Sequence, residues 1–212
     1  RLMEPEVELP VWEDIEELAA VVQRRGYHGG RRLMMAALMA LARHCRIAGL
    51  PVPSASFALS WTSTIPLRVG LAGSSALVIA AIRAAAAFWE LPLAPADLVE
   101  ISLRAETVEL GIPAGPQDRV AQAYEGLVYF THGESGRIEA ERLDLSALPP
   151  LFVAIDEEAG EGTEVFHSTL RERFQRGDSA VVEGVARQAD LTRRGVEFLR
   201  ARRGGELGVL MD

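Results

Sequence analysis

The stretch from Val69 to Ala76, which opens onto an alanine-rich run from Leu77 to Trp89, constrains the fold of this chain more than any other segment. Two glycines and two serines stand at the start of what the apolar pattern predicts to be a long helix. In such a turn the backbone N–H groups and the hydroxyls converge on one spot, and the positive end of the helix dipole lies behind them. A polyphosphate suits this spot, so the segment predicts a nucleotide-binding site.

An ordinary helix start is the alternative interpretation of the same residues. Gly73 and its neighbours also fit a turn in which Ser74 or Ser75 caps the helix by accepting from the first free amides. The spacing differs from that of a P-loop, because no lysine follows the last glycine. It also matches the Rossmann fingerprint only loosely, through Gly70, Gly73 and Ala76. The short motif therefore needs support from a second segment.

That support comes from residues 105–119, Ala-Glu-Thr-Val-Glu-Leu-Gly-Ile-Pro-Ala-Gly-Pro-Gln-Asp-Arg. The pattern predicts the end of a helix over 98–110, a glycine stop at Gly111, a Pro/Gly loop and a new helix that begins near Gln117. Asp118 then falls in the first helical turn, where the helix dipole favours a carboxylate. By itself Asp118 is an ordinary N-terminal helix acid. Beside the glycine-serine turn it becomes a carboxylate that can meet a hydroxyl about to receive a phosphoryl group.

The two segments together resemble the GHMP kinases, the family of galactokinase, homoserine kinase and mevalonate kinase. Residues 66–76 are similar to the central phosphate-binding motif of that family, and residues 105–118 to the segment that carries its metal-binding Glu and its catalytic Asp. Further stretches, among them residues 26–35 and the pair His167-Ser168, resemble the glucuronokinases of this family. The resemblance covers essentially the whole chain.

The resemblance implies a role for each residue of the two motifs. The phosphates of ATP would be bound by Gly70, Leu71, Ala72, Gly73, Ser74, Ser75 and Ala76. The Ser75 hydroxyl and the Glu106 carboxylate would bind Mg²⁺, and Asp118 would accept or orient the proton of the acceptor hydroxyl. Glu109 is the rival metal ligand, but Glu106 stands five residues before Gly111, as the metal-binding Glu of the family does. Composition alone favours a solvated helical acid at Glu106.

Two residues are candidates for binding the acceptor. Arg119 stands where galactokinase and mevalonate kinase typically carry an amide side chain, and its guanidinium suits a bidentate pair with a uronate carboxylate. The alternative is an Arg119 side chain that faces solvent. Tyr27 begins a helix that lines the acceptor side in similar kinases, so it is expected either to contact a sugar or simply to pack.

The function implied by the resemblance is an ATP- and Mg²⁺-dependent sugar 1-kinase that phosphorylates the anomeric hydroxyl of D-glucuronate. One alternative keeps the chemistry and changes the sugar to galacturonate, galactose or a similar sugar. The other is a non-catalytic nucleotide-binding piece with the same fold. The small-molecule sugar acid and ATP are the expected partners, and the oligomeric state stays open.

The fold implied by the resemblance is α+β, the GHMP kinase two-domain fold. Residues 1–148 would be the ATP-binding domain, similar to domain 2 of ribosomal protein S5 with its opening strands missing. Residues 149–212, which begin with Pro149-Pro150, would be the start of the ferredoxin-like second domain. Neither the N-terminal nor the C-terminal family motif is visible, and no Met precedes Arg1, so we expect a fold that is incomplete at both ends.

Hydrophobic periodicity predicts the individual elements. Helices are expected over residues 11–25, 31–48, 77–89, 96–110, 117–124, 164–176 and 179–202, and strands over 56–63, 127–131, 139–145 and 151–155. Glu125 stands where glucuronokinases tend to have glycine; a positive φ at this position would cost about 1 kcal/mol or more.

Composition narrows the class of protein. The net charge of −8 argues against nonspecific binding to nucleic acid, which depends on basic residues. The longest apolar run, residues 76–89, is too short for a membrane span, and no stretch has the order of a signal peptide. Cys45 is the single cysteine, which excludes an internal disulfide and a cysteine metal cluster, and it is expected to pack in a helix. We therefore expect a cytoplasmic enzyme with no nucleic-acid or membrane partner.

Overall fold

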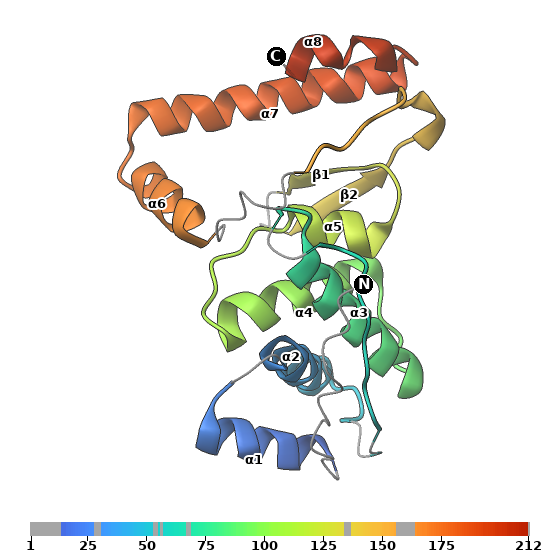
Figure 1. Ribbon diagram of the computed structural model, residues 1–212, viewed down its shortest axis with the longest axis vertical. Coiled ribbons are helices and arrows are strands. Elements are labelled where there is room, and N and C mark those ends of the chain that lie inside the picture. Colours follow the sequence, from blue (N-terminus) through green and yellow to red (C-terminus); the bar gives the residue numbers. More distant parts are fainter. Residues whose placement is uncertain are drawn as a thin grey trace. The chain divides into compact units, whose positions relative to one another are not determined.

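Helices form most of the described chain. The computed structural model describes residues 14–27, 31–52, 55, 57–66, 69–133, 137–155 and 164–211. In chain order the elements are α1 (Ile15–Arg25), α2 (Arg32–Ala48), α3 (Gly73–Phe88), α4 (Pro95–Arg104), the π-helical turn η1 (Ala105–Glu109), α5 (Gln117–Tyr124), β1 (Val128–His132), β2 (Ile138–Arg142), the 3₁₀ turn η2 (Leu145–Ala147), α6 (Glu164–Gln175), α7 (Ser179–Arg200), the 3₁₀ turn η3 (Gly204–Glu206) and α8 (Gly208–Met211) (Figure 1). They fall into two compact units, one that ends at Ala123 and one that begins at Tyr124.

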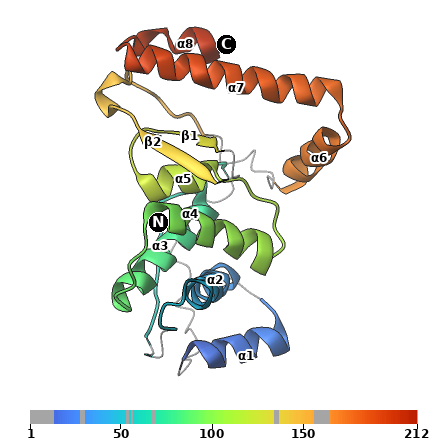
Figure 2. The same ribbon diagram turned by 180° about the vertical axis from the view of Figure 1, so that it is seen from behind.

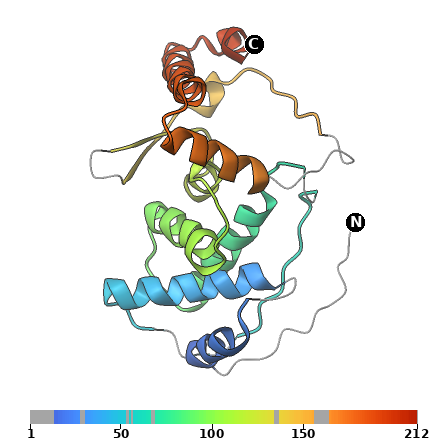
Figure 3. The ribbon, with the colours of Figure 1, turned by 90° about the vertical axis from the view of Figure 1, so that its left-hand side faces the viewer.

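The first unit is built around α2. Its buried residues run without a break from Met34 to Ala42 and include Cys45. Helices α1, α3 and α4 and the turn η1 all pack against it, and Figures 2 and 3 show α1 on one side of α2 and the other helices on the opposite side. A helix that is apolar nearly all round lies inside its unit. Cys45 packs in this core as predicted, and burial raises the pKa of its thiol.

The predicted helices are confirmed, with ends that shift by a few residues. Those over 31–48, 77–89, 96–110, 117–124, 164–176 and 179–202 correspond to α2, α3, α4 with η1, α5, α6 and α7. The helix expected over 11–25 begins at Ile15, because the Asp14 carboxylate accepts from the N–H of Glu17 at 2.8 Å; residues 11–13 lie outside the described residues.

Gly111 and Glu125 are two of the described residues that have positive φ and follow a helix. Gly111 has φ +65°, which confirms the predicted glycine stop directly after η1 and Leu110. Glu125 has φ +59° directly after α5, so the backbone strain expected there for a residue other than glycine applies.

The second unit contains an antiparallel hairpin and the long helix α7. Strand β1 pairs with β2 from Val128 opposite Arg142 to His132 opposite Ile138. After the hairpin, the Asp144 carboxylate accepts from the N–H and the hydroxyl of Ser146, which holds the pKa of Asp144 below its usual value. Ion pairs then join the end of α7 to this segment, from Arg200 to Glu141 and from Arg202 to Asp144.

Two predicted strands are wrong. The described residues of 56–63 and all of 151–155 are outside any strand. A strand satisfies its N–H and C=O groups by pairing with a neighbour, and within the described chain β1 and β2 pair only with each other. The strand expected over 139–145 ends earlier, at Arg142, because η2 follows the Asp144 turn. The strand expected over 127–131 lies one residue further on, as β1.

At the level of fold class, the described chain combines helices with one small sheet, which is compatible with the predicted α+β class. The boundary expected between residues 148 and 149 stays a prediction about the family's domains. Among the described residues, no helix has the length and apolar character needed to cross a bilayer.

The role of α2 as the core of the first unit predicts unequal effects of two changes on the same helix. Leu41→Ala removes a side chain that is fully buried and is expected to lower the free energy of unfolding by about 2–5 kcal/mol. Ile47→Ala, at a position that is 72% exposed, is the matched control and should change it by about 0.5 kcal/mol or less. Urea unfolding followed by circular dichroism measures both, and equal losses would contradict this assignment of the core.

Candidate functional site

The glycine-serine turn forms the N-terminus of α3. Gly70 has φ +75° and Ala72 has φ +54°, and the helix begins at Gly73. The alternative in which Ser74 or Ser75 caps the helix is wrong, because the helix begins at Gly73, both serines lie inside its first turn, and no side chain caps it. The first N–H groups of a helix have no intrahelical partner. They are therefore suited to an anion here, as the phosphate-site interpretation requires. Leu67 and Arg68, in the same motif, lie outside the described residues.

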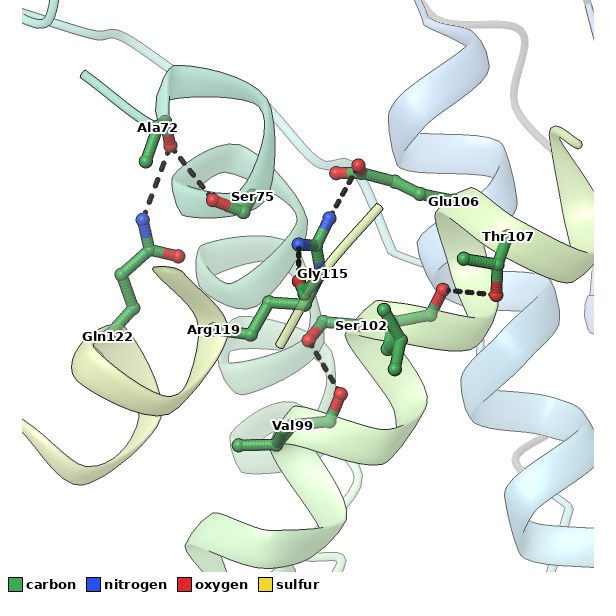
Figure 4. Close-up of polar contacts among 10 residues, drawn as sticks. Ala72, Ser75, Val99, Ser102, Glu106, Thr107, Gly115, Arg119 and Gln122 are labelled. Atoms are coloured by element: carbon green, nitrogen blue, oxygen red, sulfur yellow. Dashed lines mark hydrogen bonds and ion pairs between the residues drawn. The ribbon is translucent and has the colours of Figure 1, made fainter. Parts of the chain in front are cut away.

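The carbonyl of Ala72 joins this turn to α5. It accepts from the buried hydroxyl of Ser75 at 3.0 Å and from Nε2 of Gln122 at 3.2 Å (Figure 4). The two bonds hold Ala72 in a left-handed conformation that costs a non-glycine residue on the order of 1 kcal/mol. The residue patterns did not single out Gln122 as a residue of the site. The available signal was its spacing, since it follows Asp118 by four residues and Arg119 by three and so shares their side of a helix.

Glu106 and Arg119 form a buried ion pair at the centre of the site. Nη2 of Arg119 lies 2.5 Å from Oε2 of Glu106, and the two residues are 3% and 4% exposed. Nη1 of Arg119 donates to the carbonyl of Gly115 at 2.6 Å. The solvent-facing alternative for Arg119 and the solvated-acid alternative for Glu106 are therefore both wrong. Both charges leave water only because each neutralises the other.

Glu109, the rival metal ligand, is held by two other residues. Its side chain is 5% exposed; Oε1 lies 2.8 Å from Nε of Arg43, and Oε2 accepts from the Tyr27 hydroxyl at 2.5 Å. Burial, and then the bond to Glu109, raise the pKa of Tyr27 well above its usual value. The Tyr27 hydroxyl thus fixes the π-helical turn. Whether its ring also contacts a sugar stays a prediction.

Asp118 lies in the first turn of α5, as predicted, and its carboxylate is exposed. No hydrogen bond or ion pair joins it to another residue in the described parts of the chain. Its neighbour Arg119 points into the protein, toward Glu106 (Figure 4). The carboxylate is therefore accessible next to the buried pair, and its catalytic role stays a prediction.

The oxygen donors near the start of α3 fit a magnesium ion. In Figure 4 the Glu106 carboxylate points from η1 toward the first turn of α3, which carries Ser75. A carboxylate and a hydroxyl are hard oxygen ligands, and Mg²⁺ usually takes only one or two of them from the protein and the rest from water and phosphate. Within the described residues, no group of three or more His, Cys, Asp or Glu side chains forms a metal cluster.

A separate hollow lies at the other end of α3. It has a volume of about 410 Å³ and is lined mainly by apolar residues of 50–52, 55 and 88–92, among them Phe88 and Trp89. A helix of this length, 16 residues, spans about 24 Å. The hollow is therefore not part of the site at the N-terminus of α3.

The comparison with protein families gives an independent result. Residues 32–126 match the family described as GHMP kinases N terminal domain. The matched range extends from the start of α2 to just beyond α5 and includes both motifs. It confirms the resemblance predicted from the sequence.

Three curated proteins are similar to the chain. Glucuronokinase 1 of Arabidopsis thaliana is 32% identical over 208 residues, which is 93% of this chain and 56% of the relative. Probable glucuronokinase 2 of the same plant is 31% identical over 216 residues, 97% of this chain and 58% of the relative. The chain thus spans little more than half the length of these relatives. D-glycero-alpha-D-manno-heptose 7-phosphate kinase of Campylobacter jejuni is 34% identical over 83 residues, 39% of this chain and 24% of the relative. No solved structure matches the chain significantly.

The Tyr27–Glu109 bond predicts a measurable ionisation. A phenol whose pKa is raised in the folded state stabilises the fold below the unfolded pKa of about 10, and this contribution is lost as the pH rises toward the folded value. Ultraviolet titration should therefore show a tyrosine that ionises only at very alkaline pH or on unfolding. Tyr27→Phe should remove that step, and Tyr129→Phe, in the second unit, serves as the control. A high-pH step that persists in Tyr27→Phe would show that another tyrosine causes it.

Proposed function

We propose that this chain, of which residues 32–126 match the GHMP kinase N-terminal domain family, is part of an ATP-dependent sugar kinase that phosphorylates the anomeric hydroxyl of D-glucuronate. The observation that carries the proposal is the meeting of distant stretches of sequence at one place. Ser75 on α3, Glu106 on η1 and Arg119 on α5 lie around the same spot in Figure 4. Asp118 directly precedes Arg119 in the first turn of α5. The curated relatives named glucuronokinase support the choice of sugar.

Phosphoryl transfer from ATP requires that the protein position the phosphates, neutralise their charge and align the acceptor. The turn from Gly70 to Ala76 would bind the phosphates through its N–H groups at the N-terminus of α3. Two hydrogen bonds from within the chain, donated by Ser75 and Gln122, hold the Ala72 carbonyl and with it the shape of the turn. Such preorganisation lowers the cost of ordering the turn when ATP binds.

Ser75 and Glu106 are the proposed protein ligands of Mg²⁺. When bound, Mg²⁺ would supply the positive charge that neutralises the phosphates during transfer. The Ser75 oxygen keeps lone pairs available, because its hydroxyl acts as the donor in the bond to Ala72. The Glu106 carboxylate is held by Arg119 in this structure, so its role as a ligand requires Arg119 to shift.

Asp118 is the proposed catalytic residue. Its exposed carboxylate at the start of α5 would accept the proton of the sugar hydroxyl or orient that hydroxyl toward the phosphate. An anomeric hydroxyl is more acidic than an ordinary alcohol, so this step does not demand an unusually strong base.

Arg119 is the proposed contact to the uronate. A guanidinium forms two parallel hydrogen bonds with a carboxylate, as a lysine cannot. Arg119 already binds one carboxylate, that of Glu106, in a buried setting where such pairs are selective. A neutral hexose offers no group of this kind, so Arg119 would favour a sugar acid.

The finer fold assignment belongs to the same proposal. We infer that residues 1–148 correspond to the ATP-binding domain, similar to domain 2 of ribosomal protein S5, and 149–212 to the start of a ferredoxin-like domain. A kinase for another sugar is the second candidate, because the third relative is named a heptose phosphate kinase.

The proposal predicts a new anomeric phosphate signal in ³¹P NMR when the protein is incubated with Mg-ATP and glucuronate. Galacturonate, galactose and glucose, tested in parallel, are expected to give none. A signal with one of these sugars instead would support the kinase activity but contradict glucuronate as the substrate. If no sugar gives a signal and calorimetry detects no binding of Mg-ATP, the proposed kinase activity is contradicted.

Two variants assign the roles in the same assay. Asp118→Asn should lower turnover by about 10²–10⁴-fold while Mg-ATP still binds. Arg119→Gln should reduce the preference for glucuronate over a neutral hexose, and an unchanged preference would remove Arg119 from substrate recognition. Arg83→Gln is the control for loss of an arginine, because Arg83 donates to the carbonyls of Gln122 and Ala123 at the far end of α5.

A further inference from the structure

The Arg119 guanidinium is buried but incompletely bonded. Of its five N–H donors, Nη1 reaches Gly115 and Nη2 reaches Glu106, whereas Nε is buried with no hydrogen-bond partner among the described residues. A buried donor that is left unsatisfied weakens the arrangement in which it is found. The observed position of Arg119 is therefore one that another arrangement of the site can displace.

The pair also places two positive charges in competition for one carboxylate. Oε2 of Glu106 lies 2.5 Å from Arg119, and the proposed function assigns the same carboxylate to Mg²⁺. A divalent cation at this carboxylate would repel a guanidinium at hydrogen-bond distance, and strongly so because both side chains are buried. Contact of both cations with this one carboxylate is therefore electrostatically unfavourable.

We propose that Arg119 is an internal counter-ion that neutralises Glu106 in the metal-free protein and is displaced from it when Mg²⁺ binds. This inference rests on the proposed function for the metal-binding role of Glu106. Displacement frees the guanidinium directly beside Asp118, where the acceptor is expected. Arg119 thus becomes available to a uronate only after the metal has bound, which makes the nucleotide-metal complex the first ligand and the sugar acid the second.

The alternative is that the pair serves only to stabilise the fold. In that case removal of Arg119 leaves a buried negative charge and a weaker structure, but it removes no competitor of the metal. The two interpretations therefore differ in the affinity for a divalent cation measured without nucleotide or sugar.

The test is the binding of Mn²⁺ alone to the 212-residue chain, followed by electron paramagnetic resonance of the free ion. Arg119→Gln is expected to bind Mn²⁺ more tightly than the wild type, by roughly 5- to 150-fold, the range typical of coupling between two bound ligands. Glu106→Gln/Arg119→Gln should lose this gain. Arg43→Gln is the matched control, because Arg43 pairs with Glu109 on the same π-helical turn and should leave Mn²⁺ affinity unchanged. Equal or weaker binding by Arg119→Gln with an unchanged circular dichroism spectrum overturns the proposal.

If Arg119→Gln does not fold, a second measurement, made on the wild type, tests whether the metal ion displaces Arg119. The Nε–Hε NMR signal of Arg119, assigned through Arg119→Lys, should move on addition of MgCl₂ at concentrations that displace bound Mn²⁺. An unmoved signal, or no Mn²⁺ binding, overturns the proposal. This outcome can be told apart from failure of the proposed function, because neither readout depends on turnover. If the protein is an active kinase but the Arg119 signal does not move, only the displacement of Arg119 by the metal ion is contradicted.

Discussion

The ion pair between Glu106 and Arg119 determines how the parts of the site are arranged. It joins the π-helical turn that follows α4 to the first turn of α5, across a Pro/Gly loop that has no regular structure of its own. With Arg119 fixed, Asp118 stands one position earlier at the exposed start of α5. Gln122, three positions later, reaches the Ala72 carbonyl of the glycine-serine turn. One buried contact thus sets the positions of the residues proposed for phosphate binding, metal binding and catalysis.

The burial of charge in this region requires that each carboxylate have its own cation. Glu106 and Glu109 both lie on η1 and are both nearly inaccessible, and like charges so close would oppose folding if they were not neutralised. Arg119 neutralises the first, whereas Arg43, with the Tyr27 hydroxyl, neutralises the second. The partners come from different parts of the chain, so Glu109 anchors η1 to α2 and to Tyr27, and Glu106 anchors it to α5.

The sequence predicted the features that depend on local chemistry. Helices follow from periodicity, and the glycine stop at Gly111 and the place of Asp118 in a first helical turn follow from the residues next to them. The burial of Arg119 did not follow, because it depends on a carboxylate that lies thirteen residues earlier and meets it only in the folded unit. The prediction of a strand over 151–155 was wrong for a related reason: a strand must pair with a neighbouring strand, and its own residues do not specify that neighbour.

The most direct test of this account is a double-mutant cycle on the pair, with unfolding by urea measured in EDTA for the wild type, Glu106→Gln, Arg119→Gln and the double variant. The account predicts that each single change costs about 3–5 kcal/mol, because it leaves one buried charge without its partner. The double variant should cost much less than the sum, with an interaction energy of at least about 1 kcal/mol. Additive losses, with an interaction energy near zero, would contradict the claim that this contact holds the site together.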